Sequence, residues 1–166
     1  MSWLFAPTVN RWFQSYYANG ILSNFEVKHW TQEPLPSDRS LQRAFRNLVT
    51  VVVPINGRDV TILVTHLDRG EIRQAQLEFV LDRFKQISGP AILMGDLNVD
   101  ESEVLLQQLF ETGEHQDAIF QAIGDFWRLD WIITRGFEVL EGGYTPRGIS
   151  DHAHYWVELK FDSTKD

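Results

Sequence analysis

One short segment near the middle of the chain most constrains its fold. Four apolar residues, 91–94, follow Pro90 and run directly into Gly95-Asp96-Leu97-Asn98. A short, wholly apolar run bounded by proline and glycine is typical of a strand buried on both faces. We therefore predict a strand inside a sheet that ends abruptly at the sheet edge. A glycine at that end allows a sharp turn or a close approach to a ligand.

Two polar side chains follow this predicted strand. In an extended chain, residues two apart point to the same side, so Asp96 and Asn98 would face one ligand while Leu97 points into the core. A carboxylate and an amide oxygen suit a hard cation or a phosphate group. The plain alternative is an Asx turn between a strand and a helix, with no ligand.

Length and composition limit the class of protein and its partners. The 166 residues, without a repeat or linker, predict a single domain over 1–166. No apolar run is long enough to span a bilayer and no leader is visible, so we expect a cytoplasmic protein without a transmembrane segment. The absence of Cys excludes disulfides and thiolate chemistry and fits a reducing compartment. A net charge of −8 repels polyanions, so a phosphate compound must bind locally, with help from a cation.

Hydrophobic periodicity predicts mostly strands, with two helices between them. Two β-branched runs, 48–55 and 60–65, flank Asn56-Gly57 and predict a hairpin. An apolar stripe predicts a helix over 71–87, and a capping-box-like start at Asp100 predicts a second helix that ends at Gly113. The remaining predicted elements are a short strand at 3–5, a turn signal within 16–23 that leads into another short strand, strands at 25–30, 126–133, 137–140 and 155–161, and a loop at 142–148.

Polar groups of one chemical kind accompany four of these predicted strands. Three strands end or begin beside them, and an isolated acid within the fourth demands a partner. The candidate site residues are His66, Asp96, Asn98, Asp130, Asp151 and His152. Ordinary turns at strand ends would explain any one of them, but not the whole set.

Four motifs in chain order closely resemble the endonuclease/exonuclease/phosphatase family of metal-dependent phosphoesterases, which includes exonuclease III and DNase I. They are 65–67 (T-H-L), 95–98 (G-D-L-N), 129–133 (L-D-W-I-I) and 150–152 (S-D-H). Residues 19–23 resemble the family's G-N-A-I-L-S segment, and the likeness extends from about Trp3 to Lys160. It implies an α/β fold of the α+β kind: a DNase I-like two-layer β-sandwich flanked by helices.

The family's opening strands have no counterpart in this sequence. One carries an Asn and the next ends in a metal-binding Glu, so the resemblance implies a fold that is incomplete in its N-terminal half. Glu33 repeats only the Q-E dipeptide of that motif; it follows the 19–23 segment and has no buried strand before it. We therefore do not assign Glu33 as a metal ligand. The gap would expose an apolar sheet face, which a second copy in a homo-oligomer could cover.

The resemblance implies hydrolysis of a phosphodiester or phosphomonoester by an activated water. His152 would contact the phosphate and help to activate the water, while Asp130 holds its imidazole in orientation. Asp96 and Asn98 would position the nucleophile and the phosphoryl oxygens. His66 would donate a hydrogen bond or proton to the phosphate.

The implied cofactor is Mg²⁺ or Mn²⁺ at Asp96, Asn98 and Asp151, which would supply the positive charge that phosphoryl transfer requires. The expected substrate is a small or lipid-like phosphoester rather than duplex DNA, because the chain is acidic and only Arg39, Arg43, Arg46 and Arg58 are moderately clustered. The competing hypothesis is a catalytically inactive module that binds a phosphate compound or a partner.

Overall fold

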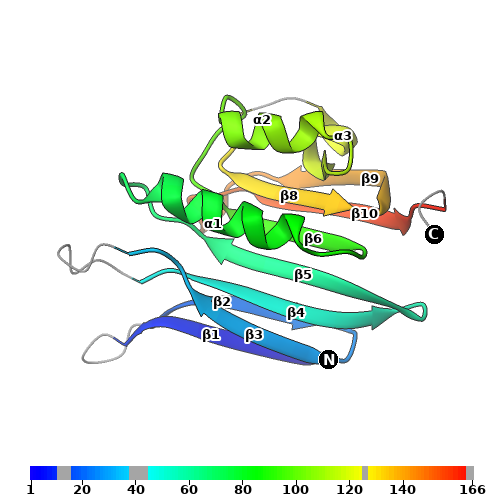
Figure 1. Ribbon diagram of the computed structural model, residues 1–166, viewed down its shortest axis with the longest axis horizontal. Coiled ribbons are helices and arrows are strands. Elements are labelled where there is room, and N and C mark those ends of the chain that lie inside the picture. Colours follow the sequence, from blue (N-terminus) through cyan, green and yellow to red (C-terminus); the bar gives the residue numbers. More distant parts are fainter. Residues whose placement is uncertain (11–15, 38–44, 125–126, 164–166) are drawn as a thin grey trace.

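The computed structural model describes residues 1–10, 16–37, 45–124 and 127–163, which form mainly strands (Figure 1). The strands are β1 (Ser2–Asn10), β2 (Tyr16–Ser23), β3 (His29–Pro34), β4 (Asn47–Ile55), β5 (Arg58–His66), β6 (Ala91–Asp96), β7 (Gln116–Asp117), β8 (Asp130–Arg135), β9 (Phe137–Thr145) and β10 (His154–Phe161). The helices are α1 (Arg73–Lys85), α2 (Val104–Glu111) and α3 (Ala118–Ile123). None of these described helices is long and apolar enough to cross a membrane.

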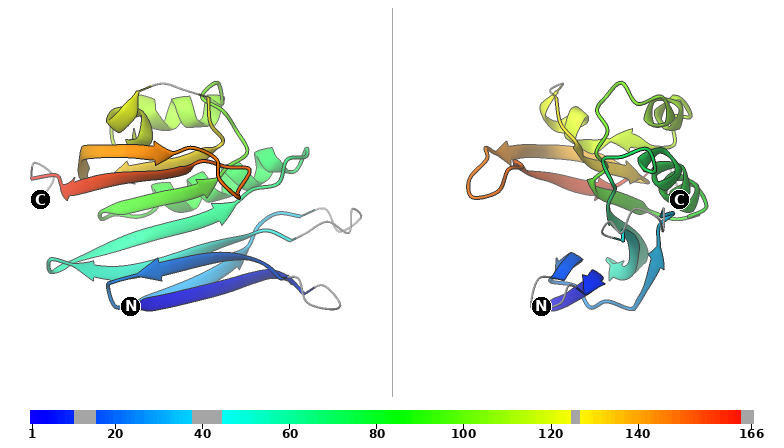
Figure 2. Two further views of the ribbon diagram at one scale, coloured as in Figure 1. Left: turned by 180° about the vertical axis from the view of Figure 1, so that it is seen from behind. Right: turned by 90° about the vertical axis from the view of Figure 1, so that its left-hand side faces the viewer.

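A six-stranded sheet with the order β3-β4-β5-β6-β8-β7 forms the centre of the described structure. Helices α1 and α2 cover one face, and two separate two-stranded ribbons, β1-β2 and β9-β10, lie over the other (Figure 2). The second β layer is therefore built from two ribbons rather than one continuous sheet. This sheet-dominated α/β arrangement confirms the expected fold class.

The centre of the sheet follows the sequence predictions closely. β4 and β5 form the expected hairpin, and Asn56 and Gly57 both have positive φ angles, 50° and 81°. Such angles are those of the two-residue turns that match the twist of paired strands. β6 confirms the predicted strand at 91–94; it pairs in parallel with β5 and antiparallel with β8.

Alternating side chains of the central strands build a core on each face. Leu63, Leu93 and Ile133 are buried on the helical face, where Leu77 and Phe84 of α1 pack in the same cluster. α1 thus confirms the predicted helix at 71–87, with narrower bounds. α2 is also present, but its N-cap is Glu103, whose carboxylate accepts a hydrogen bond from the backbone of Leu105. The predicted helix start at Asp100 is therefore wrong, because that carboxylate is engaged by Ser102.

The opposite face is covered by the two ribbons. Ala6 of β1 packs with Val49 and Val51 of β4, and Phe137 of β9 packs with Val53 and Val60. The outward face of the β1-β2 ribbon is different, because Trp3 (75% exposed) and Leu22 (78%) lie opposite each other there. This ribbon therefore leaves large apolar side chains on the surface.

Two predictions near the N-terminus are wrong. The turn predicted within 16–23 is absent, and all eight residues belong to β2; Asn19 donates hydrogen bonds to the carbonyl and side-chain oxygens of Asn47 and is thereby fixed beside β4. The strand predicted at 25–30 begins only at His29, where pairing with Val52 starts, and it continues to Pro34. Proline is tolerated at the end of an edge strand because no partner needs its missing N–H.

The C-terminal half also corrects the sequence predictions. Residues 142–145, predicted as loop, belong to β9, because they pair with 154–157 of β10; a side chain at Gly142 would come within 2.7 Å of Ala122 in α3. The strand predicted at 126–133 starts at Asp130, and Phe126 lies outside the described residues. β7 and α3 were not predicted at all; they have only 2 and 6 residues, too few for a periodic signal.

Candidate active site

Three of the predicted site residues form one row across three adjacent strands. His66 ends β5, Asp96 ends β6 and Asp130 begins β8. The strand register places His66 beside Asp96 and Asp96 beside Asp130. Because β8 runs antiparallel to β6, its first residue meets the last residue of β6. The sheet topology thus gathers residues that are up to 64 positions apart, from 66 to 130, at one edge.

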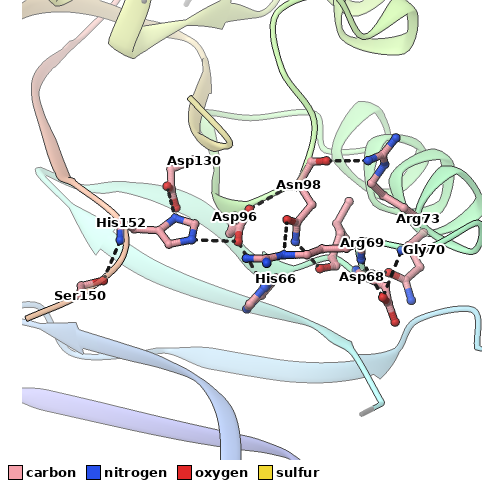
Figure 3. Close-up of polar contacts among 12 residues, drawn as sticks. His66, Asp68, Arg69, Gly70, Arg73, Asp96, Asn98, Asp130, Ser150 and His152 are labelled. Atoms are coloured by element: carbon pink, nitrogen blue, oxygen red, sulfur yellow. Dashed lines mark hydrogen bonds and ion pairs between the residues drawn. The ribbon is translucent and has the colours of Figure 1, made fainter. Parts of the chain in front are cut away.

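His152 completes this row from the loop before β10 (Figure 3). Its Nδ1 lies 2.6 Å from Oδ2 of Asp130, and its Nε2 lies 3.7 Å from Oδ2 of Asp96. From the other side, Nε2 of His66 lies 3.3 Å from the same Asp96 oxygen. The carboxylate of Asp96 is therefore placed between two imidazoles. We call His66, Asp96, Asp130 and His152 the polar row.

The two imidazoles have opposite electrostatic surroundings. The hydrogen bond with Asp130 raises the pKa of His152, with the Asp96 and Asp151 charges acting in the same direction. Burial and the Arg46 guanidinium instead lower the pKa of His66. Near neutral pH, His66 is accordingly a neutral hydrogen-bonding group, whereas His152 takes up a proton more readily.

Asp96 and Asn98 do not have the predicted extended arrangement. Asn98 adopts a left-handed conformation with φ 52°, and its backbone N–H donates to Oδ1 of Asp96 at 2.9 Å. The Asn98 side chain donates to the Leu67 carbonyl and accepts from Nε of Arg69. The Asx turn considered as the alternative is thus present, although Leu97 is buried as expected. Asn98 ties the end of β6 to the loop after β5.

Gly95 explains how β5 and β6 approach so closely at the polar row. Its φ is +139°, and a Cβ atom added there would lie 1.9 Å from the backbone oxygen of Thr65. That backbone conformation is essentially restricted to glycine. The glycine that marked the strand end in the sequence is therefore required by the position of Asp96.

An open cleft of about 1000 Å³ lies beside the polar row. Asn98, Asp130, Asp151 and His152 contribute to its lining, together with Arg69. Arg69 was not predicted; its only signal was its position in the loop that follows the T-H-L motif. The cleft has room for a small organic group next to these polar side chains.

The sequence from residue 2 to residue 152 matches the family model described as the Endonuclease/Exonuclease/phosphatase family. The chain belongs to the endonuclease/exonuclease/phosphatase family. This match confirms the resemblance seen in the ordered motifs. No protein with a curated description matches the sequence.

Several solved structures have the same fold as this chain. A family protein from Bacteroides vulgatus superposes with a TM-score of 0.77 at 16% identity, over 97% of this chain and 76% of the other. A mannosyl-6-phosphatase from Bacteroides thetaiotaomicron gives 0.73 at 18% identity, over 96% and 77%. The human Nocturnin catalytic domain gives 0.72 at 18% identity, over 97% and 72%. The DNase I-like fold of the family is thereby confirmed.

Members of this family are generally dependent on a divalent metal, so the fit of these residues to a cation matters. Oδ2 of Asp96 is buried and has no hydrogen-bond partner within the described part of the chain, as a carboxylate oxygen that faces a cation would. Asn98 suits a cation less well, because its side-chain oxygen already faces the Arg69 guanidinium. Asp151 is exposed, and Glu33 lies away from the row in an ion pair with Arg83. Among the described residues, no three His, Asp or Glu side chains form a preformed metal cage.

Replacing Asp130 with Asn is expected to lower the pKa of His152, because it removes the largest contribution that raises this pKa. A histidine that acts as a base is active only when neutral, so activity should rise as the pH passes the His152 pKa. In the Asp130→Asn variant, this increase in activity should occur at lower pH. A titration of the imidazole signals by NMR measures the shift directly. Asp151→Asn should give a smaller decrease, since the Asp151 charge contributes least. An unchanged His152 pKa in Asp130→Asn would refute the assignment of Asp130 as the group that raises this pKa.

Proposed function

We propose that this family member hydrolyses a phosphodiester or phosphomonoester with a water molecule that His152 activates, in the presence of Mg²⁺ or Mn²⁺. The observation that carries the proposal is the short contact between Nδ1 of His152 and Asp130, which leaves Nε2 as the hydrogen acceptor beside Asp96. Many hydrolytic sites have the same arrangement, in which a carboxylate binds one nitrogen of a histidine and the other nitrogen acts as the base.

In the proposed reaction, a water donates hydrogen bonds to Nε2 of His152 and to the buried Oδ2 of Asp96. His152 takes one proton as the water oxygen bonds to phosphorus, and the bond from phosphorus to the leaving oxygen breaks. The leaving oxygen then receives a proton from bulk water, and His152 returns the proton that it took to the solvent. Neutral His66 donates a hydrogen bond to a phosphoryl oxygen, and Asn98 holds the loop that places Asp96.

The divalent ion would supply positive charge to the phosphoryl oxygens, which an acidic chain lacks. Of the candidate ligands Asp96, Asn98 and Asp151, we propose Asp96 as the main protein ligand, because its Oδ2 is buried and accepts no hydrogen bond from the described residues. Water and substrate oxygens would occupy the other positions, as is usual for Mg²⁺. An ion held in this way binds weakly, so activity should need a high metal concentration.

We further propose a small phosphoester as the substrate rather than duplex DNA. The open cleft of about 1000 Å³ has the volume of a small-molecule site. A net charge of −8 opposes binding of a long polyanion. The similar fold of a mannosyl-6-phosphatase is compatible with such a substrate. Of the arginines that motivated this view, Arg39 and Arg43 lie outside the described residues.

The deciding experiment measures hydrolysis of 4-nitrophenyl phosphate and bis(4-nitrophenyl) phosphate during titration with Mg²⁺ and Mn²⁺. We expect metal-dependent turnover that Asp96→Asn abolishes. Asp59→Asn is the matched control, because it changes an exposed carboxylate that pairs with Lys28. A folded sample without turnover at millimolar metal would reject hydrolysis and favour the alternative, an inactive module that binds a phosphate compound or a partner.

A further inference from the structure

Two of the aromatic side chains that line the cleft are more than half exposed and have no part in the proposed hydrolysis. They are Trp127, which is 60% exposed, and Tyr144, which is 54% exposed. Both share the cleft with Asp130 and His152. Stacking an aromatic ring against a ligand removes apolar surface from water, which favours binding. Because the aromatic side chain has few rotatable bonds, it loses little conformational entropy in doing so. The two rings are therefore candidates for contact with the organic part of a substrate.

The ring of Tyr144 has a described packing partner, and Trp127 adjoins a residue that is fixed in the structure. Tyr144 lies near the end of β9, opposite Tyr155 of β10, and their ring centroids are 6.3 Å apart. Trp127 directly precedes Arg128, which is buried and ion-paired with Asp117. A binding surface that is already ordered loses less conformational entropy when a ligand binds.

A third aromatic residue near the site can be assigned to the core. Trp131 is only 2% exposed, its Nε1 donates a hydrogen bond to the Val99 carbonyl, and its ring lies under the Arg128 guanidinium at 4.5 Å. Trp131 thus supports the cleft wall from inside. Only Trp127 and Tyr144 combine a place in the cleft lining with a half-exposed ring among the described aromatic residues.

We propose that the cleft selects phosphoesters whose organic group carries a flat aromatic ring, and that this ring stacks on Trp127 and Tyr144. The inference rests on the proposed function, because it needs the phosphate beside Asp130 and His152. A nucleobase and a simple aryl group share the required chemistry, since each offers a π face. An aliphatic sugar phosphate lacks that face and should bind less tightly.

The test measures binding of phosphonates, whose carbon–phosphorus bond is not hydrolysed, to the full chain by calorimetry with Mg²⁺ present. The four probes are methylphosphonate, phenylphosphonate, the methylene phosphonate analogue of adenosine 5′-monophosphate and that of a hexose 6-phosphate. We expect the two ring-bearing probes to bind about tenfold tighter than the other two, as a single stacked base commonly provides. The adenosine and phenyl probes then distinguish a nucleobase from an aryl group.

Three variants show whether the two aromatic residues cause the preference. In Trp127→Leu and Tyr144→Leu, the affinity ratio of phenylphosphonate to methylphosphonate should fall towards one, whereas Trp127→Phe should retain most of it. Trp30→Leu is the control, because Trp30 is also exposed (47%) but lies on β3 and not in the cleft lining.

The outcomes separate this inference from the proposed function. If methylphosphonate binds but a ring adds no affinity, or if the hexose analogue binds most tightly, the stacking inference is wrong and the phosphate site remains. A ring preference that survives both leucine variants also overturns it. If no phosphonate binds, the phosphate site itself is wrong, and both proposals fail.

Discussion

Replacing His152 with alanine is expected to lower kcat for phosphoester hydrolysis by about a hundred- to ten-thousand-fold, the range typical for loss of a positioned acid–base group. Substrate affinity should change much less, because the proton transfer occurs only as the reaction proceeds. Steady-state kinetics on a chromogenic phosphoester at saturating metal measures both quantities. The expected size of the effect follows from the position of His152, whose imidazole bridges Asp130 and Asp96.

The matched control for this substitution is His29→Ala. His29 is exposed on the edge strand β3, where its loss removes a histidine without touching the polar row. Its kcat should equal that of the unmodified protein. If His152→Ala remained folded with an unchanged kcat, His152 would not be the base, and the proposed assignment of roles would be wrong.

Replacing Gly95 with alanine is expected to destabilise the fold by about 3 kcal/mol or more, since backbone strain and overpacking each contribute about 1–3 kcal/mol. The new Cβ would lie 1.9 Å from the Thr65 carbonyl oxygen, and the φ of +139° disfavours any side chain. For a chain of this size, the melting temperature should fall by about 6–12 °C. Thermal unfolding followed by circular dichroism measures the change.

Gly148→Ala provides the comparison for this second variant. No atom lies within 4 Å of the position that a Cβ would take at Gly148, and its φ is not positive. Its melting temperature should stay within about 1–2 °C of the unmodified value, as is usual for a surface substitution. Equal melting temperatures for the two variants would mean that β5 and β6 are not packed as closely as described.

The parts of the fold that the sequence predicts well are those with local causes. The hairpin of β4 and β5 follows from Asn56-Gly57, whose backbone preferences determine the turn by themselves. β6 follows from an apolar run bounded by Pro90 and Gly95, and α1 from a long periodic stripe. In each case the signal lies within the segment itself.

The wrong predictions arise where a distant contact decides the local structure. Asn19-Gly20 has the sequence of a turn, but hydrogen bonds from Asn19 to Asn47 keep it in a strand. Gly142 has the sequence of a loop residue, but it is a strand residue that makes room for Ala122 of α3. A single sequence does not reveal such partners, since they are 28 and 20 residues away.

The candidate site shows the same division. The residue types that gather in the polar row were identified from their motifs, because His, Asp and Asn at strand ends stand out from an apolar background. Their mutual geometry was not predictable: the left-handed conformation of Asn98 and the contact of Arg69 with its amide depend on two loops that meet in space. Trp127 and Tyr144, the proposed stacking residues, differ from the core residue Trp131 in their exposure, which the sequence does not reveal.

Three of the four residues of the polar row lie on paired strands, whereas the cleft is formed largely by loops, and this division has a consequence for how such a protein can diversify. His66, Asp96 and Asp130 are fixed by pairing between β5, β6 and β8, whereas Trp127 and Arg147 belong to connecting segments. Loops tolerate substitution and insertion far better than paired strands. Descendants of this chain could therefore acquire new substrates by altering the cleft wall, while His66, Asp96 and Asp130 keep their spacing.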